Sequence, residues 1–125
     1  MAPLLLEYQK VILDNNDIGP KIQKLPPQDI HYFKGILAFF EAIPDEKWCT
    51  GTMKSSFYGH NQYCALGHIA YFGGYLITTT EFLHKFRIAS GNHVALVNDG
   101  HGPLRPENTP KGRVCGAIKD ILKNQ

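Results

Sequence analysis

The sequence contains no long hydrophobic run. A helix that spans a membrane needs about 20 consecutive apolar residues, and no segment of the 125 residues approaches that length. An apolar triplet stands at positions 4–6, but no basic residue precedes it and Glu7 interrupts it. A secretory signal needs a basic start and a longer apolar core. We therefore expect a protein that is neither embedded in a membrane nor exported.

Cysteine is scarce and unclustered. Cys49, Cys64 and Cys115 are the three cysteines of the chain, so they cannot all pair within it, and none belongs to a Cys-x-x-Cys motif. Such usage is typical of proteins in a reducing compartment. The sequence therefore predicts a cytoplasmic location.

Paired metal-binding elements are also absent. Cys64 and His68 are four residues apart and could bind zinc together with His60, His93 or His101, because thiolates and imidazoles are zinc ligands. No Cys-x-x-Cys or His-x-x-x-His pair supports such a site. A histidine beside a cysteine on a helix is more often a hydrogen-bonded core residue. We expect no metal and no cofactor.

Charge of neither sign dominates. The chain has 13 Lys and Arg against 11 Asp and Glu, a formal net charge of +2, and its basic residues are scattered. A nucleic-acid-binding protein usually concentrates basic residues in one stripe, so we expect no nucleic-acid partner. The length of 125 residues and the hydrophobic fraction of 43% are those of one globular domain that folds on its own.

What the chain does contain is helical periodicity. Apolar residues recur at i, i+3 and i+4 over positions 29–43, and Pro44 then ends the pattern. The apolar segment 61–72 predicts a second helix, which Gly-Gly terminates. Two further helices are expected, at 79–89 and from Thr109 onward, each behind a threonine that can cap it. The sequence therefore predicts a mainly helical protein.

The strand signals are weaker than the helical ones. Segments 4–13 and 93–97 are short and apolar, so each could be a strand or a helical turn. Positions 54–61 are polar and predict a loop. We expect a mainly α, small single-domain helical bundle, with an extended N-terminal arm at 1–27 and a compact helical domain at 28–125. A small α+β fold is the alternative.

The segment 61–72 combines the most core-forming surface with the most potential chemistry. As a helix it would hold Cys64 in its first turn, and it would place His68 on the same face because positions four apart are neighbours. We expect this helix at the centre of the molecule. The Trp48 loop and the turn at 98–99 are expected to meet around its leading end.

Four landmarks occur in order along the chain. They are Trp48-x-x-Gly51, Cys64-x-x-Gly67, Val97-Asn98-Asp99 and a terminal helix that is led by Thr109 and contains Val114. Their order and spacing resemble an uncharacterised domain family of bacteria and phages, whose members show W-x-x-G, C-x-x-G-A and W-N-D before a Thr-initiated last helix. The resemblance covers about residues 30–123. It implies a small, mostly helical domain in which these motifs converge, and it implies no known activity.

The chain departs from that family pattern at two positions. His68 stands where the family usually has alanine, and Val97 stands where it usually has tryptophan. His68 is therefore not a catalytic base common to the family. The arm at 1–27 also lies outside the resemblance and could hold what is particular to this protein.

A cysteine nucleophile is the enzymatic hypothesis. Cys64 near a helix N-terminus would have a lowered thiol pKa, because unpaired N–H groups stabilise the thiolate. His93, or His68, would be the base, and Asn98 would orient it, in the chain order of papain-like enzymes. The alternative is that Cys64 is a small buried hydrophobe, and we lean toward a protein that is not an enzyme.

A ligand pocket is the other hypothesis. Aromatic rings would stack on a flat ligand and basic side chains would meet its anionic group. The pocket would lie between the Trp48 loop, the central helix and the loop at 98–113. Its candidate residues are Trp48, Tyr63, His68, Asn98, Asp99, Arg105 and Arg113.

The function predicted from these features is that of a small non-catalytic binding protein of phage or bacterial origin. It would sequester a small anionic or nucleotide-like ligand, or block a host protein. The alternative is a cysteine-dependent hydrolase or transferase using Cys64. A homo-oligomer joined through the N-terminal arm is a further possibility.

Overall fold

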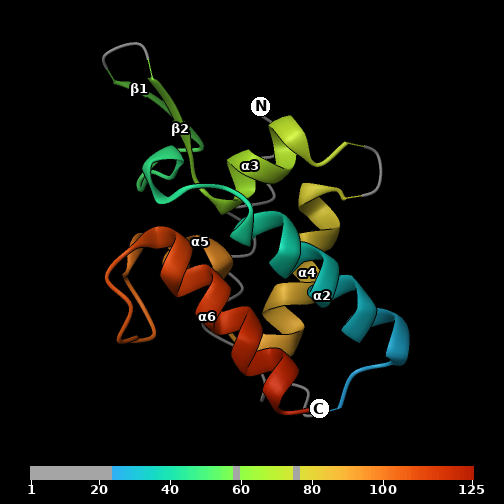
Figure 1. The fold of residues 1–125 in the computed structure, drawn as a ribbon. Coiled ribbons are helices and arrows are strands. Elements are labelled where there is room, and N and C mark those ends of the chain that lie inside the picture. The colour runs from blue at the N-terminus through green and yellow to red at the C-terminus, as the bar shows by residue number, and fades with distance from the viewer. Residues whose placement is uncertain (1–23, 58–59, 75–76) are drawn as a thin grey trace.

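A computed structural model describes residues 24–57, 60–74 and 77–125. Positions 1–23 lie outside the described residues, and with them most of the predicted arm. The described chain is mainly helical, and its one sheet there is a two-stranded hairpin (Figure 1). The predicted mainly α fold is confirmed.

Helix α2 (Pro27–Glu41) is the first described element. It begins two residues before the predicted Asp29, because Pro27 occupies the first turn, where its missing N–H costs no hydrogen bond. Phe33, Ile36 and Phe40 form its buried face. A short 3-10 helix, η2 (Asp45–Lys47), follows Pro44.

The next segment differs from the prediction. Residues 54–61 were expected to loop and 61–63 to be helical, but strands β1 (Lys54–Phe57) and β2 (His60–Tyr63) form an antiparallel hairpin. Figure 1 shows the hairpin extending away from the helices. The base of the hairpin is held by a bridge between Tyr63 and Trp48 and by the Cys49 N–H, which donates to the Tyr63 carbonyl at 3.0 Å. This pairing between distant residues overrides the local helical pattern.

Helix α3 (Ala65–Phe72) is therefore shorter than predicted. Cys64 is its N-cap rather than a residue of its first turn. Helix α4 (Thr79–Ser90) follows, with Thr78 as its cap, and confirms the predicted helix at 79–89. It ends at Gly91, whose φ of 75° places it in the left-handed region that favours glycine.

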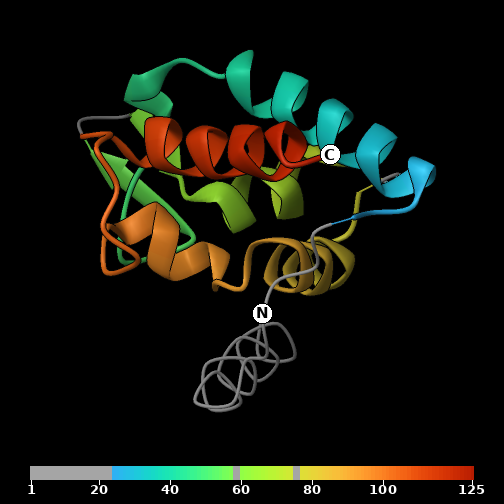
Figure 2. The ribbon, with the colours of Figure 1, turned by 90° about the horizontal axis from the view of Figure 1, so that it is seen from below.

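The ambiguous apolar segment after α4 is helical. It forms α5 (Val94–Asp99), with His93 as the N-cap. The last helix, α6 (Pro110–Lys123), starts behind Thr109 as predicted. Its buried face contacts α2, α3, α4 and α5. Figure 2 shows α6 in red, with α2 along one side and α4 and α5 along the other.

The core lies between α6 and the helices around it. Residues 65–69 of α3 are all buried, whereas residues 70–72 are exposed, so the leading part of the middle helix lies in the interior. The largest fully buried side chains include Phe33, Phe40, Phe82, Phe86, Leu66 and Ile118. Within the described ranges, none of the helices has the length and apolar character needed to cross a membrane.

Candidate functional site

The N-terminus of α3 is held by Asn98. The Asn98 side-chain oxygen accepts a hydrogen bond from the Ala65 N–H at 3.0 Å, and its Nδ2 donates to the Cys49 carbonyl at 3.0 Å. Asn98 is 1% exposed. The segments that carry the Trp48, Cys64 and Asn98 motifs thus meet at the leading end of the central helix, as expected from the sequence.

Cys64 is buried and its environment disfavours the thiolate. Its Sγ accepts a hydrogen bond from the Gly67 N–H at 3.4 Å. Burial raises the thiol pKa above its usual range, although the Gly67 and Leu66 amides act in the opposite direction. The pKa lowering expected from the helix N-terminus is therefore wrong, because desolvation outweighs the helix amides.

The other members of the catalytic hypothesis are engaged in structural contacts. His93 is buried and its Nδ1 accepts from the Ala95 N–H at 3.2 Å, which caps α5. Both N–H groups of the Asn98 amide are used, by the Cys49 carbonyl and by Asp99 Oδ1 at 2.9 Å. These contacts favour a structural role for Cys64, His93 and Asn98. Catalysis by these residues stays a prediction.

Arg113 also stabilises this region. Its guanidinium donates to the carbonyls of Val97 at 3.1 Å and Asn98 at 2.8 Å, at the C-terminal end of α5. A cation at this position complements the partial negative charge of a helix C-terminus. Asn98, Asp99 and Arg113 thus form a structural corner, and the first two are the last residues of α5.

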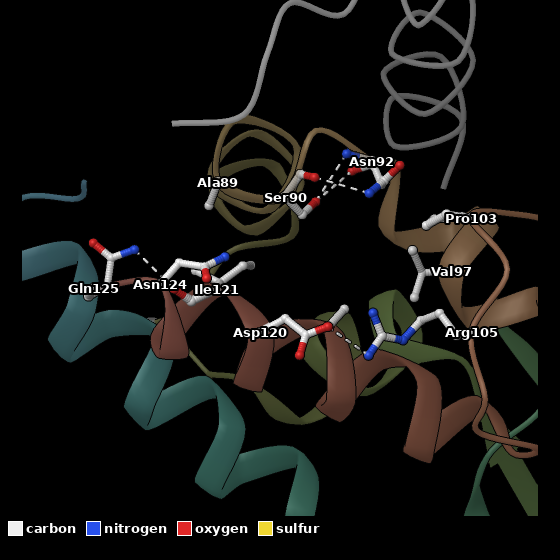
Figure 3. Close-up of a pocket in the computed structure, with 11 residues that line it drawn as sticks. Ala89, Ser90, Asn92, Val97, Pro103, Arg105, Asp120, Ile121, Asn124 and Gln125 are labelled. Atoms are coloured by element: carbon white, nitrogen blue, oxygen red, sulfur yellow. Dashed lines mark hydrogen bonds and ion pairs between the residues drawn. The ribbon is translucent and has the colours of Figure 1, made fainter. Parts of the chain in front are cut away.

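Arg105 lies apart from this corner, beside a small pocket of about 170 Å³. Figure 3 shows its guanidinium pointing toward Asp120 of α6, and the two are 3.0 Å apart. Two further nitrogen–oxygen contacts, of 2.9 and 3.1 Å, join Arg105 to Glu107. Because two carboxylates already neutralise it, Arg105 is poorly suited to bind an anionic ligand.

A larger pocket, of about 470 Å³, lies on the other side of α3. We call it the His68 pocket. It is formed by the end of α2, by η2, by β2 and by α3. Its lining residues are Phe39, Ile43, Lys47, His60, Asn61, Tyr63, His68 and Phe72.

His68 is held in this pocket by aromatic rings. Its ring centroid lies 4.7 Å from that of Trp48 and 5.3 Å from that of Tyr63. Phe72 packs edge-on against Tyr63 at 5.0 Å, and its side chain is 57% exposed. Of the predicted ligand residues, Tyr63 and His68 therefore line the pocket, and Trp48 packs against the His68 ring.

His68 is a buried polar side chain without a partner. It is 2% exposed, and neither ring nitrogen makes a hydrogen bond within the described part of the chain. Buried polar groups are nearly always hydrogen-bonded. Burial lowers the His68 pKa to about 4, while the nearby carbonyls of Lys47 and Tyr63 partly oppose this shift. The imidazole is therefore neutral near pH 7.

No family model, no curated protein and no solved structure matches this chain. The resemblance to an uncharacterised bacterial and phage domain family therefore stays a prediction. In the described residues, no three His, Cys, Asp or Glu side chains are grouped so as to hold a metal ion.

Sequence reasoning missed several lining residues of the pocket. Lys47 and His60 are polar residues that flank loops, and Phe72 has the spacing of an ordinary core position. Ile43 was attributed only to the helical pattern of 29–43, and Phe39 was assigned no role. Only the hairpin, which the sequence did not predict, brings His60 to the same cavity as α2 and α3.

The lowered His68 pKa predicts a specific loss of stability in acid. The unfolded chain binds a proton near the ordinary pKa of about 6.5, whereas the folded chain resists protonation until about pH 4. Stability from neutral His68 is thus fully present above pH 6.5 and is lost as the pH falls toward 4. The total loss is about 3 kcal/mol.

Urea titrations between pH 7.5 and 4 measure this loss. His68→Phe keeps a ring against Trp48 and Tyr63 but cannot be protonated, so its free energy of unfolding should fall less over the same range. The difference between the two pH profiles of unfolding free energy gives the contribution of His68. Groups that titrate in both proteins cancel, such as Glu107, whose pKa is lowered by Arg105. Parallel pH profiles for the two proteins would contradict this account.

Proposed function

We propose that the protein is a non-catalytic binding protein for a small, planar, anionic ligand, whose ring enters the His68 pocket. The observation that supports this most directly is a buried histidine without a partner in the wall of an aromatic cavity. A ligand that hydrogen-bonds His68 would satisfy it. Action in a phage or a bacterium, by sequestering such a ligand, rests on the resemblance described above.

The size and walls of the pocket fit such a ligand. Small-molecule sites have volumes of about 300 to 1,000 Å³ and largely apolar walls with a few polar groups, and the His68 pocket measures about 470 Å³. Tyr63 and Phe72 offer ring surfaces for stacking or edge-to-face contact. Because Phe72 is 57% exposed, a ligand ring would remove apolar surface from water.

The charges of the lining residues favour an anionic group at the rim of the pocket. The described lining residues include Lys47 and His60, both exposed, and no acidic side chain. Neutral His68 offers no positive charge, and because its pKa is lowered to about 4, protonating it at pH 7 would cost about 4 kcal/mol. The ring of the ligand should therefore face His68, while its anionic group lies near Lys47.

Binding can be measured through Trp48, the single tryptophan of the chain, because its ring packs on His68. Adenosine monophosphate and 4-hydroxyphenylacetate each combine a ring with an anionic group. Ribose 5-phosphate and acetate are the matched anions that lack the aromatic ring, and we call them ring-free. We expect saturable changes in fluorescence with at least one ring-bearing probe and none with the two ring-free anions.

A pair of lysine variants tests the position of the anionic group. Lys47→Ala should weaken binding of the ring-bearing probe about threefold, as expected for an exposed ion pair. Lys54→Ala is the matched control, because Lys54 lies over the Tyr71 ring and is not among the lining residues. Equal binding of ring-bearing and ring-free anions, or no binding of any probe, would overturn the proposed function.

A further inference from the structure

The hydrogen-bonding inventory of the His68 pocket restricts the ligand further. A neutral imidazole has one N–H donor and one unprotonated nitrogen that can only accept. The backbone carbonyls of Lys47 and Tyr63 lie close to the ring. Carbonyl oxygens only accept, so they could serve the N–H of the imidazole but never its unprotonated nitrogen.

The unprotonated nitrogen therefore needs a donor that the described residues do not supply. His68 is 2% exposed and neither of its nitrogens has a hydrogen-bond partner in the described chain. Of the polar lining residues, Asn61 accepts from Ser56 through its side-chain oxygen, while Lys47 and His60 are exposed. A buried acceptor that lacks a donor loses the water it would bind in the unfolded chain.

We infer that the ligand of the His68 pocket carries an N–H or O–H donor on the inner edge of its ring and gives that hydrogen bond to His68. This inference rests on the proposed function. It selects phenols and amino- or imino-bearing heteroaromatic rings, such as nucleobases, over rings that bear only acceptors or alkyl groups. The aromatic packing around His68 restrains the imidazole, so we assign the donor to the ligand rather than to a rotation of the histidine ring.

Two series of matched probes test this selectivity and distinguish the two sources of the donor. In the phenol series, 4-hydroxyphenylacetate has the donor, whereas phenylacetate lacks it and 4-methoxyphenylacetate replaces it by an acceptor. In the nucleotide series, adenosine monophosphate has the exocyclic amino group and purine riboside monophosphate lacks it. The anionic group is unchanged within each series.

The donor-bearing probe should bind about tenfold more tightly than its matched partners, because an unmade hydrogen bond to a buried group costs about one factor of ten. The series that shows this preference identifies the source of the donor. In His68→Phe the preference should disappear while the donor-free probes still bind. The 15N resonances of the His68 ring in the wild-type protein are a second readout, since the unprotonated nitrogen should shift only with the donor-bearing probe.

The possible failures are distinguishable. If probes bind the wild-type protein but neither series shows the preference, or if the preference persists in His68→Phe, the donor inference is overturned and the proposed function stands. If no probe of either series binds, the proposed function and the donor inference are both overturned. Should His68→Phe fail to fold, the affinities and 15N shifts of the wild-type protein decide the question.

Discussion

Gly67→Ala is expected to destabilise the domain by about 4 kcal/mol or more, which is at the upper end of single-residue effects. A β-carbon at this position would overlap the carbonyl oxygen of Met53 and would also lie 3.2 Å from the Tyr63 β-carbon. The Met53 oxygen cannot easily move, because it accepts from the Cys64 N–H. Thermal or urea unfolding followed by circular dichroism measures the loss.

Gly35→Ala is the matched control for this prediction. Gly35 lies in helix α2 with no atom within 4 Å of an added β-carbon. Alanine there should stabilise the protein by about 0.5 to 1 kcal/mol, because glycine is a poor helix former. If Gly67→Ala behaved like Gly35→Ala, the close approach of the Met53 segment to α3 would be refuted.

This close approach also bears on the candidate site. The segment that contacts Gly67 continues into β1, and β2 then brings Tyr63 against His68. A side chain at Gly67 would push this segment away from α3. We expect the Trp48 fluorescence of a folded Gly67→Ala fraction to differ from that of the wild type, because the indole packs on His68.

Asn98→Ala is expected to destabilise the domain by about 4 kcal/mol, since two buried backbone groups would each lose a hydrogen bond worth about 1 to 3 kcal/mol and a cavity would remain. The groups are the Ala65 N–H and the Cys49 carbonyl, which Asn98 joins across 33 and 49 residues of sequence. Denaturant unfolding measures this effect. Both hydrogen bonds join segments that are far apart in the sequence.

Two variants at the same corner serve as controls. Asp99→Ala removes one partly buried contact to Asn98 and should cost only about 1 kcal/mol. Asn98→Asp keeps the acceptor for Ala65 but places a second carboxylate beside Asp99, so its destabilisation should be larger at pH 7 than at pH 4. A near-neutral effect of Asn98→Ala would instead indicate that Asn98 is free for a role in binding or catalysis.

The elements predicted best are those with their own local stop and start signals. Helices α4 and α6 begin behind Thr78 and Thr109, whose hydroxyl groups accept from Glu81 N at 3.2 Å and Gly112 N at 3.0 Å. Capping of this kind depends on residues three positions apart. The sequence alone was therefore sufficient to place these helices.

The hairpin was missed for the opposite reason. Positions 54–61 are mostly polar with no strand alternation, and 61–63 directly precede the apolar residues of α3. What makes them strands is backbone pairing, across the hairpin and between Trp48 and Tyr63. Such pairing is set by chain segments that meet only in the folded protein.

The predicted site residues also fall into two groups, those that lie at the pocket and those that hydrogen-bond the backbone. Trp48, Tyr63 and His68 were predicted as ligand residues from their types; Tyr63 and His68 line the pocket, and Trp48 packs against His68. Asn98 and Arg113 were predicted with them, but both satisfy backbone groups at the ends of α3 and α5. The sequence contains no signal that distinguishes a polar side chain used by the backbone from one left without a partner.

The sequence by itself determined that this protein is mainly helical and where two of its capped helices begin, because periodicity and capping act between residues a few positions apart. Only the tertiary structure decided that Asn98 ties α3 to the Cys49 segment and that His68 lies in an aromatic cavity without a hydrogen-bond partner. Both depend on which distant groups meet after folding, and therefore on desolvation and hydrogen bonding that no local pattern encodes.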